Sequence, residues 1–317
     1  MIAEKAFLIP ASISRIFPNF RGKVRAFLAY YKALGLHDTH VYVETKLKKP
    51  VEFSIGLDLR CHHERMAFLL NGHEPDTTKF LVQLYDGEGA FLDIGANIGL
   101  ISIPFALIVS NSGELNYVNE NQTFVYSIEA IKANLVSLKS NCERNNLGEK
   151  VIIVPHGVGN EEKTVDIQIE RDLKDGEGTG TANILSATTD QQYERVPLEL
   201  TTLDLLRNRR QLPEKISLIK IDLDGYDLFA MQGASRLLKE CRPVVFGEFN
   251  AHCMNWHGQT ITDVELFMAE LGYETFCRAG SEWRFTAKFD AETYRTDCLL
   301  VPSEKVMNLE WCLAGSN

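Results

Sequence analysis

The sequence has no long apolar run and no closely paired cysteines. No segment reaches the roughly 18–20 consecutive apolar residues that a membrane-spanning helix needs, although 45% of the 317 residues are hydrophobic. The seven cysteines are odd in number and none forms a CxxC pair. This usage argues against a disulfide framework or a zinc site and favours reduced, buried thiols in a cytoplasmic protein. The apolar N-terminus is interrupted by Glu4 and no small-residue cleavage site follows, so we do not expect a secretory signal.

Basic residues are scarce outside the N-terminal region. Residues 1–50 contain nine Lys/Arg and three Asp/Glu, whereas the remainder contains 24 and 40, a net charge of −16. Nucleic-acid binding depends on neutralising phosphates, so we expect no nucleic-acid partner. Residues 20–34 have the apolar spacing of a helix with basic side chains on its other faces. This helix is a candidate for peripheral contact with an anionic membrane, although a solvated face explains the same pattern. Nothing in the sequence indicates an oligomeric state.

Short β-rich runs alternate with helical patterns from about residue 90 onward. The predicted strands are Ala90–Ile94, Phe124–Ile128, Val151–Pro155, Ile216–Ile221, Pro243–Glu248, Glu274–Cys277 and Asp297–Val301. The predicted helices are Leu100–Val109, Ala130–Asn145, Asp227–Glu240 and Thr262–Leu271. This alternation predicts an α/β fold with a seven-stranded, mostly parallel, doubly wound sheet and a closing antiparallel hairpin. Ligands of such sheets bind at the carboxyl ends of the strands.

The segments around this core give three further predictions. Residues 1–85 form an N-terminal extension packed on the core, with a strand at Val51–Leu59 and a helix at Cys61–Asn71. His62, His63 and Glu64 are interpreted as surface residues of that helix. The main domain spans 86–305 and a tail spans 306–317. The Gly-rich stretch Arg171–Arg195 is either a lid near the site or a surface loop without a role.

The clearest motif lies where the first predicted sheet strand ends. Asp93 ends the strand, and the turn Gly95-Ala96-Asn97-x-Gly99 opens the following helix. Gly95 permits a tight turn and close approach of a ligand, and Gly99 permits close packing of helix on strand. An acid before this turn repels a pyrophosphate but neutralises a cation. S-adenosylmethionine (SAM) carries an ammonium, a sulfonium and no phosphate, so the motif predicts a SAM site, with a generic strand–helix turn as the alternative.

Two further strand ends supply candidate contacts to SAM. Glu129 follows the second strand, where a carboxylate accepts hydrogen bonds from both ribose hydroxyls. Ala130 follows it directly. Gly157 follows the third strand and would let the chain pass close to a flat group such as adenine. The alternative for Glu129 is a solvated strand-end carboxylate.

The candidate catalytic residues follow the fourth and fifth strands. Asp222 at the fourth strand end either orients the sulfonium end of SAM or takes a proton from an acceptor hydroxyl. Glu248 is a second carboxylate at the same crevice, suited to acid–base work or to holding a metal. His252 is a possible general base or a hydrogen-bonded surface histidine. Asp227 fits a helix cap better than a catalyst. We predict no metal site, because HCMNWH offers too few ligands at suitable spacing.

The stretches FLDIGANIGLISI, SIEAIKANLVSLKSN, LIKIDLDGYDLFAMQGASRLL and PVVFGEF together resemble the FkbM family of SAM-dependent methyltransferases. The resemblance covers roughly residues 52–303. It implies a Rossmann-like class I methyltransferase fold with SAM at Asp93–Gly99, at Glu129 and near Asp222. It also implies O-methylation of a hydroxyl of a sugar, glycan or related metabolite. The chain departs from the family where Asp224 replaces a usual glutamate and Ala130 replaces a common proline.

Three rival functions remain at this point. Asp222-Leu-Asp224 is a DxD pattern, which in a glycosyltransferase holds a metal that bridges a nucleotide diphosphate. Against this, Asp93 stands where a phosphate would favour backbone amides alone. A nucleic-acid (RNA) methyltransferase is the second rival, although the chain lacks a proline- and aromatic-rich tetrad after the fourth strand for stacking a base. A binding protein that has lost catalysis is the third.

Overall fold

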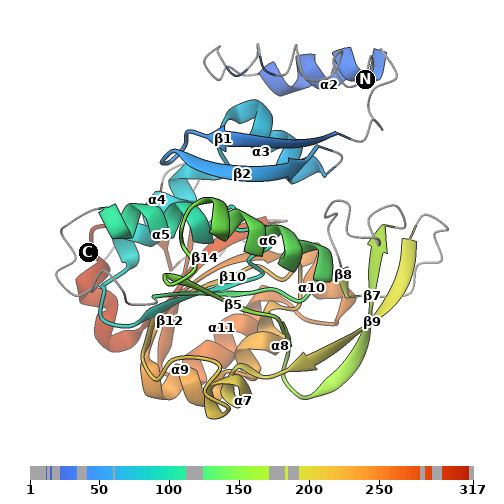
Figure 1. Cartoon of the computed structure of the whole chain (residues 1–317). Helices are drawn as coiled ribbons and strands as arrows, with labels where there is room; N and C mark the ends of the chain where they lie inside the picture. The colour runs from blue at the N-terminus through green and yellow to red at the C-terminus, as the bar shows by residue number, and fades with distance from the viewer. Residues whose placement is uncertain are drawn as a thin grey trace.

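The computed structural model describes residues 12, 15, 22–33, 41–59, 61–111, 124–170, 183–184, 193–278, 283–287 and 295–313. Helices lie on both faces of a central sheet, and a smaller hairpin and a twisted arm are added to this core (Figure 1). Most of the predicted lid is outside the described residues, since 171–182 and 185–192 are not among them.

The central sheet has eight strands in the order β13-β12-β14-β11-β10-β3-β4-β5. Their bounds, in this order, are Phe285–Thr286, Tyr273–Arg278, Arg295–Pro302, Val244–Asn250, Ile216–Ile221, Ala90–Ile94, Val125–Ile128 and Val151–Val154. β11, β10, β3, β4 and β5 are parallel to one another, and β14 pairs antiparallel with both β11 and β12. The predicted parallel sheet with a closing hairpin is confirmed, and short β13 is an additional edge strand.

Each face of the sheet has its own hydrophobic core. Side chains alternate between faces along a strand, so Phe91 and Leu218 lie in one core while Leu92 and Ile219 lie in the other. Because the residues that face either side of the sheet are apolar, these strands appear in the sequence as continuous apolar runs. The first face is covered by α4 (Pro75–Leu84), α5 (Ser102–Asn111) and α6 (Lys132–Arg144). The second is covered by α7 (Leu203–Asn208), α8 (Asp227–Gln232), α9 (Ser235–Cys241), α10 (Ala251–Trp256) and α11 (Ile261–Glu270).

The N-terminal segment packs on the first face through a two-stranded sheet. β1 (Tyr42–Leu47) and β2 (Phe53–Asp58) pair antiparallel, and α3 (His62–Leu70) follows. The backbone N–H of Gly56 donates to Asn141 Oδ1 on α6 at 2.8 Å. The predicted strand and helix are confirmed, but Glu64 is not a surface residue, because it is buried and accepts from the N–H of Asp58 at 2.6 Å. The boundaries 1–85, 86–305 and 306–317 stay predictions.

A second, four-stranded sheet was not predicted. It has the order β6-β9-β7-β8, formed by Gly157–Val158, Tyr193–Thr201, Lys163–Glu170 and Asn183–Ile184. β7 and β9 form the arm that projects beside the main sheet in Figure 1. Because β9 begins at Tyr193 and β8 lies within 171–195, the interpretation of that whole stretch as a loop was wrong in part. Pro197 within β9 weakened the strand signal, since proline removes a ladder donor.

α2 (Lys23–Ala33) is helical as predicted, and its contact with a membrane stays a prediction. Within the described ranges, no helix is long and apolar enough to cross a bilayer. The seven cysteines are free thiols, and all but Cys241 are buried. The described part of the chain contains no cluster of three or more His, Cys, Asp or Glu suited to a metal ion.

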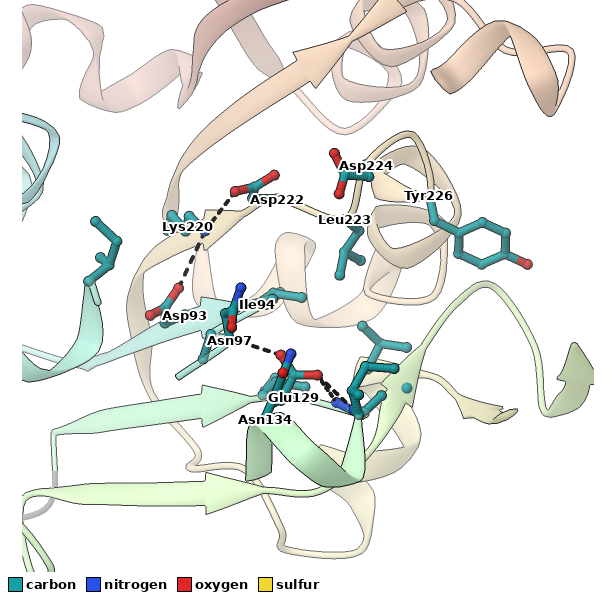
Figure 2. Close-up of a pocket in the computed structure, with 18 of the residues that line it drawn as sticks. Asp93, Ile94, Asn97, Glu129, Asn134, Lys220, Asp222, Leu223, Asp224 and Tyr226 are labelled. Atoms are coloured by element: carbon teal, nitrogen blue, oxygen red, sulfur yellow. Dashed lines mark hydrogen bonds and ion pairs between the residues drawn. The ribbon is translucent and has the colours of Figure 1, made fainter. Parts of the chain in front are cut away.

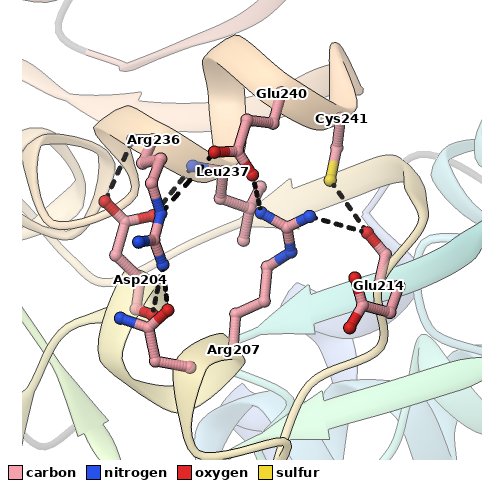
Figure 3. Close-up of polar contacts among 8 residues, drawn as sticks. Asp204, Arg207, Glu214, Arg236, Leu237, Glu240 and Cys241 are labelled. Carbon is pink, nitrogen blue, oxygen red and sulfur yellow. Dashed lines mark hydrogen bonds and ion pairs between the residues drawn. The ribbon is translucent and has the colours of Figure 1, made fainter.

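The predicted helix 227–240 is two short helices that break at Gly233. A Cβ at Gly233 would lie 2.0 Å from the carbonyl oxygen of Gly159, so only glycine permits this contact. α9 has no cap from its own N-cap residue. Instead, Asp204 on α7 accepts from the N–H of Arg236 at 2.9 Å and from that of Leu237 at 2.8 Å (Figure 3).

Asp204→Ala is expected to lower the free energy of unfolding by about 1–2 kcal/mol, the usual loss for a helix N-cap. Two N–H groups at the start of α9 lose their acceptor. Urea denaturation measures the change. Asp204→Asn retains an oxygen acceptor and is the matched control, expected to lose less. Equal stability of the alanine variant and the parent protein would contradict the capping role.

Candidate functional site

A pocket opens at the carboxyl ends of β3, β4, β10 and β11 (Figure 2). The Gly95 turn and the residues after β4 form its floor, and residues of β6, β7 and β9 form one wall. The turn between α3 and α4 contributes His73 and Glu74 to it, and α3 contributes His63. The predicted crevice at the strand ends is therefore present, with an additional wall from the N-terminal segment.

A polar row crosses the floor of this pocket. The parallel register places Ser127, Asp93 and Lys220 side by side on β4, β3 and β10. Lys220 Nζ lies 3.7 Å from Asp93 Oδ1 and 3.2 Å from Asp222 Oδ2. Ser102 donates from its hydroxyl to Asp93 Oδ2 at 2.5 Å. Asp93, predicted to neutralise a cationic ligand, is thus already paired with a cation of the chain itself.

Burial decides the charge states in this row. The side chain of Asp93 is fully buried, and this raises its pKa, while Lys220 and the Ser102 hydroxyl act in the opposite direction. Burial alone would lower the pKa of Lys220, but the carboxylates of Asp222 and Asp93 more than offset it and raise the pKa above its ordinary value. Lys220 therefore remains an ammonium at physiological pH.

The pocket as a whole is strongly acidic. Among the lining residues that the structure describes, one ammonium, that of Lys220, stands against six carboxyl groups. The carboxyl groups are those of Glu74, Asp93, Glu129, Asp222, Asp224 and Glu248. A field of this sign attracts cations and repels phosphates. The site thus fits a ligand that carries sulfonium and ammonium groups and no phosphate.

The turn after β3 has the geometry that its glycines predict. Gly95 has φ +82°, and a Cβ there would lie 2.1 Å from the carbonyl oxygen of Asp222, so the turn packs directly against the end of β10. Ala96 and Asn97 line the pocket. Gly99, with φ +93°, does not line it, because it packs against Ile103 and Leu138 of α5 and α6. Its predicted role in helix packing fits this position better than ligand contact.

Glu129 is held in place by three backbone hydrogen bonds. Its Oε1 accepts from the N–H groups of Ala130 at 2.8 Å and Ile131 at 2.7 Å, and its Oε2 accepts from the N–H of Asn97 at 2.8 Å (Figure 2). Burial raises its pKa and these backbone hydrogen bonds oppose the rise. The carboxylate is thus fixed where the β3 and β4 turns meet, inside the pocket. Its contact with ribose hydroxyls stays a prediction.

Glu129→Gln is expected to weaken SAM binding about 10–100-fold, or about 1–3 kcal/mol. An amide nitrogen cannot accept a hydrogen bond from a backbone N–H or from a ribose hydroxyl. The variant therefore removes one hydrogen-bond acceptor from the turn and from the bound SAM. Calorimetric titration with SAM measures this. Glu143→Gln, on the exposed side of α6, makes the same chemical change away from the pocket. Unchanged affinity in Glu129→Gln would remove this residue from the binding site.

Of the three predicted catalytic residues, two line the pocket and one does not. Asp222 and Glu248 both line the pocket, and the side chain of Asp222 is 33% exposed. His252 is exposed, packs edge-to-face on Trp256 at 4.9 Å between ring centroids, and is not among the pocket-lining residues. The prediction of a base at His252 therefore lacks support from its position.

Two predictions concern turns rather than catalysis. Asp227 is buried outside the pocket and accepts from the N–H groups of Leu223 at 2.9 Å and Gly225 at 3.0 Å. Burial raises its pKa to about 7. It holds the turn after β10, close to its predicted capping role.

Gly157 lines the pocket, as predicted for a residue near the cofactor. A Cβ at this position would lie 2.6 Å from Leu200, so the lack of a side chain also permits the β6–β9 pairing.

Sequence analysis missed the residues that come from the N-terminal wall and from the interior of β10. His63 was placed on a helix surface and instead lines the pocket, together with His73 and Glu74. Lys220 was not considered, although it alternates with Ile219 and Ile221 toward the same face as Asp222. That alternation was the available signal for Lys220. No local signal marks His73, whose place depends on chain packing far away in sequence.

Comparison with solved structures gives distant likenesses. A crystal structure of methyltransferase FkbM from Methylobacillus flagellatus KT aligns with 17% identity over 74% of this chain, with a TM-score of 0.41. The aligned chain spans about half of that protein, 52% of its length. An O-methyltransferase from Bacillus cereus in complex with SAH aligns with 17% identity, 72% of this chain, 81% of that chain and a TM-score of 0.39.

A third structure, M. jannaschii TYW2 in complex with AdoMet, aligns with 14% identity over 81% of this chain and 84% of that chain, with a TM-score of 0.39. No protein of curated function matches the sequence. The assignment to a family rests instead on the sequence model of the methyltransferase FkbM domain, which matches residues 93–275. Because this match covers more than half of the chain and contains the Gly95 turn, Glu129 and Asp222, the protein belongs to the FkbM methyltransferase family.

Proposed function

We propose that the protein transfers the methyl group of SAM to a hydroxyl oxygen of a sugar, glycan or related small metabolite in the cytoplasm. The observation that carries this proposal is the partly exposed carboxylate of Asp222, which lies next to the Gly95 turn and lines the same pocket as Glu248. Carboxylates accept hydrogen bonds from hydroxyl groups and stabilise the positive charge that develops on an oxygen as it is methylated. A neutral, hydroxyl-rich acceptor also meets no repulsion from the acidic pocket.

In this proposal the two substrates lie on opposite sides of the Gly95 turn. Glu129 and the wall from β6 and β9 are assigned to the ribose and adenine of SAM, and the Gly95 turn to its methionine portion. SAM supplies an electrophilic methyl group on sulfur. Asp222, Glu248 and the N-terminal wall then face the acceptor, and they orient its hydroxyl in line with the sulfur–methyl bond. Positioning of this kind accounts for most of the rate of a direct displacement.

The rivals meet specific obstacles in the pocket. A metal held by Asp222 and Asp224, as in a glycosyltransferase, would face the ammonium of Lys220 at 3.2 Å from Asp222 Oδ2. A nucleic-acid acceptor would bring phosphates toward six carboxyl groups. Both obstacles support a neutral acceptor.

The test uses SAM labelled with tritium in its methyl group. The purified protein is offered a panel of methyl glycosides and, separately, unmodified tRNA and a nucleotide sugar with manganese. Label on a glycoside, in an alkali-stable ether, supports the proposal. Label on tRNA with none on the glycosides would contradict it and assign the enzyme to RNA.

A further inference from the structure

The turn between α3 and α4 has an unusual backbone. Asn71 and Glu74 both adopt left-handed conformations, with φ 59° and φ 36°. Such conformations in residues other than glycine persist only where the surrounding structure fixes them. The carbonyl oxygen of Asn71 accepts from the N–H groups of Lys48 and Lys49 at 3.2 Å each. A Cβ at Gly72 would lie 2.7 Å from the Cβ of Lys49, so the turn is clamped against the segment after β1.

This clamped turn directs two titratable side chains into the pocket. His73 and Glu74 both line it, and Nε2 of His73 lies 3.7 Å from Oε1 of Glu74. The side chain of His73 is 18% exposed. Its ring centroid is 6.4 Å from that of His63, which lines the same wall. The imidazole is therefore inside the pocket, on the acceptor side assigned above, and not at the protein surface.

His73 also lies within electrostatic range of the end of β10. The charges of Lys220 and Asp222 both act on it, as do those of Glu74 on its own turn and His63 on α3. Lys220 and Asp222 project to the face that carries the N-terminal segment, because they alternate with Ile219 and Ile221, which face the opposite core. An acceptor hydroxyl held at Asp222 would thus lie between the strand end and the imidazole.

We propose that His73 is the general base of methyl transfer and that Glu74 positions it. This inference rests on the proposed O-methylation. The O–H bond of the acceptor breaks and its proton passes to the imidazole of His73. The oxygen forms its new bond to the methyl carbon, and the sulfur–methyl bond breaks with its electron pair returning to sulfur. The products are a methyl ether, S-adenosylhomocysteine (SAH) and an imidazolium, which the Glu74 carboxylate stabilises.

The charge state of the imidazole fits this role. Burial lowers the pKa of His73, and Lys220 and His63 act in the same direction, while Glu74 and Asp222 oppose them. The net direction is downward, so the ring is neutral and able to accept a proton at physiological pH. The carboxylate of Asp222 is the weaker choice as base, because it already pairs with Lys220 Nζ at 3.2 Å and taking up a proton would cost that ion pair.

The first test needs no acceptor. Histidine ring nitrogens labelled with ¹⁵N are followed by NMR from pH 5 to 9 in the complex with SAH, and the His73→Gln variant identifies the His73 signal. We expect a neutral ring at pH 7, with a pKa below the ordinary value for histidine. A ring that is protonated at pH 7 would overturn the proposal, because an imidazolium has no lone pair for the proton.

The second test separates His73 from cofactor binding. Calorimetric titration of His73→Gln with SAM is expected to give an affinity within about threefold of the parent protein. A tenfold or larger loss would overturn the proposal by placing His73 at the cofactor. His62→Gln makes the same change one residue before His63, on an exposed side chain, and serves as the control for folding and affinity.

The third test uses the glycoside that accepts label. We expect His73→Gln to lower kcat about 10²–10⁴-fold with a small change in KM, and to abolish the rise of kcat with pH that follows deprotonation of the imidazole. Glu74→Gln is expected to shift that rise to lower pH, because the imidazolium loses its carboxylate. An unchanged kcat in His73→Gln would overturn the proposal while leaving O-methylation intact. If label enters tRNA only, O-methylation of glycosides fails first, and the NMR and binding tests still decide the state of His73.

Discussion

Lys220→Met is expected to lower the free energy of unfolding by about 3–5 kcal/mol, the usual loss when one partner of a buried ion pair is removed. Methionine fills similar space but brings no charge. Asp93 would then be fully buried with the Ser102 hydroxyl still donating to its Oδ2, while its Oδ1 has no hydrogen bond from the described residues even in the parent protein. Urea denaturation of the two proteins, followed by circular dichroism, measures the difference.

The same variant should also acquire a pH dependence. Burial raises the pKa of Asp93, and without the opposing charge of Lys220 this pKa rises further. A carboxyl group with a raised pKa in the folded state binds more protons folded than unfolded, and stability therefore falls as pH rises through that range. We expect Lys220→Met to be less stable at pH 8 than at pH 6, by more than the parent protein changes.

A double-mutant cycle tests the cause. Asp93→Asn removes the buried charge while keeping a polar partner for Ser102, so Lys220→Met combined with Asp93→Asn should recover about 1–3 kcal/mol of the loss, a range typical of groups in contact. If the stability losses of Lys220→Met and Asp93→Asn simply add in the double variant, the ion pair between Lys220 and Asp93 does not account for the destabilisation. The cycle thus measures the interaction that holds the floor of the pocket.

The main sheet could be predicted from the sequence because its strands are apolar on both faces. Ala90–Ile94 and Ile216–Ile221 were predicted with the bounds that the structure shows. Each is bordered by turn residues and supplies side chains to both cores. The turn at Gly95 followed from the same local pattern, since the glycine and the preceding acid lie within a few residues of each other.

The N-terminal wall of the pocket could not be predicted in this way. His73 lies nearly 150 residues before Lys220 in the sequence, and the two line the same pocket only through tertiary packing, of which the contact of Gly72 with Lys49 is one part. A local pattern contains no information about such a contact. Likewise, the pairing of β7 with β9 closes a long connection, and β9 carries Pro197, so neither length nor propensity indicated a strand. The strand-end residues of the site thus followed from local signals, whereas the residues of the N-terminal wall depend on tertiary packing.

Asp222→Asn is expected to lower kcat about 10²–10³-fold while changing SAM affinity only a few-fold, because removing one preorganised group that stabilises transition-state charge typically has this effect. Asparagine keeps the size of the side chain and can still contact Lys220, but it no longer balances the positive charge that develops on the methylated oxygen. Methyl transfer to the accepted glycoside and calorimetry with SAM provide the two measurements. Asp224→Asn, two residues on, is the comparison, and equal losses in both would favour a metal-binding DxD over this role.

The double variant with His73→Gln then distinguishes two ways in which Asp222 could act. If Asp222 stabilises charge on the oxygen and His73 removes the proton from it, both act on one transition state. Each removal then makes the other less damaging, as for catalytic groups that work as a unit. The loss in the double variant should therefore be clearly smaller than the product of the two single losses. Independent losses that multiply would mean that Asp222 acts through Lys220 and the pocket floor, away from the proton that His73 receives.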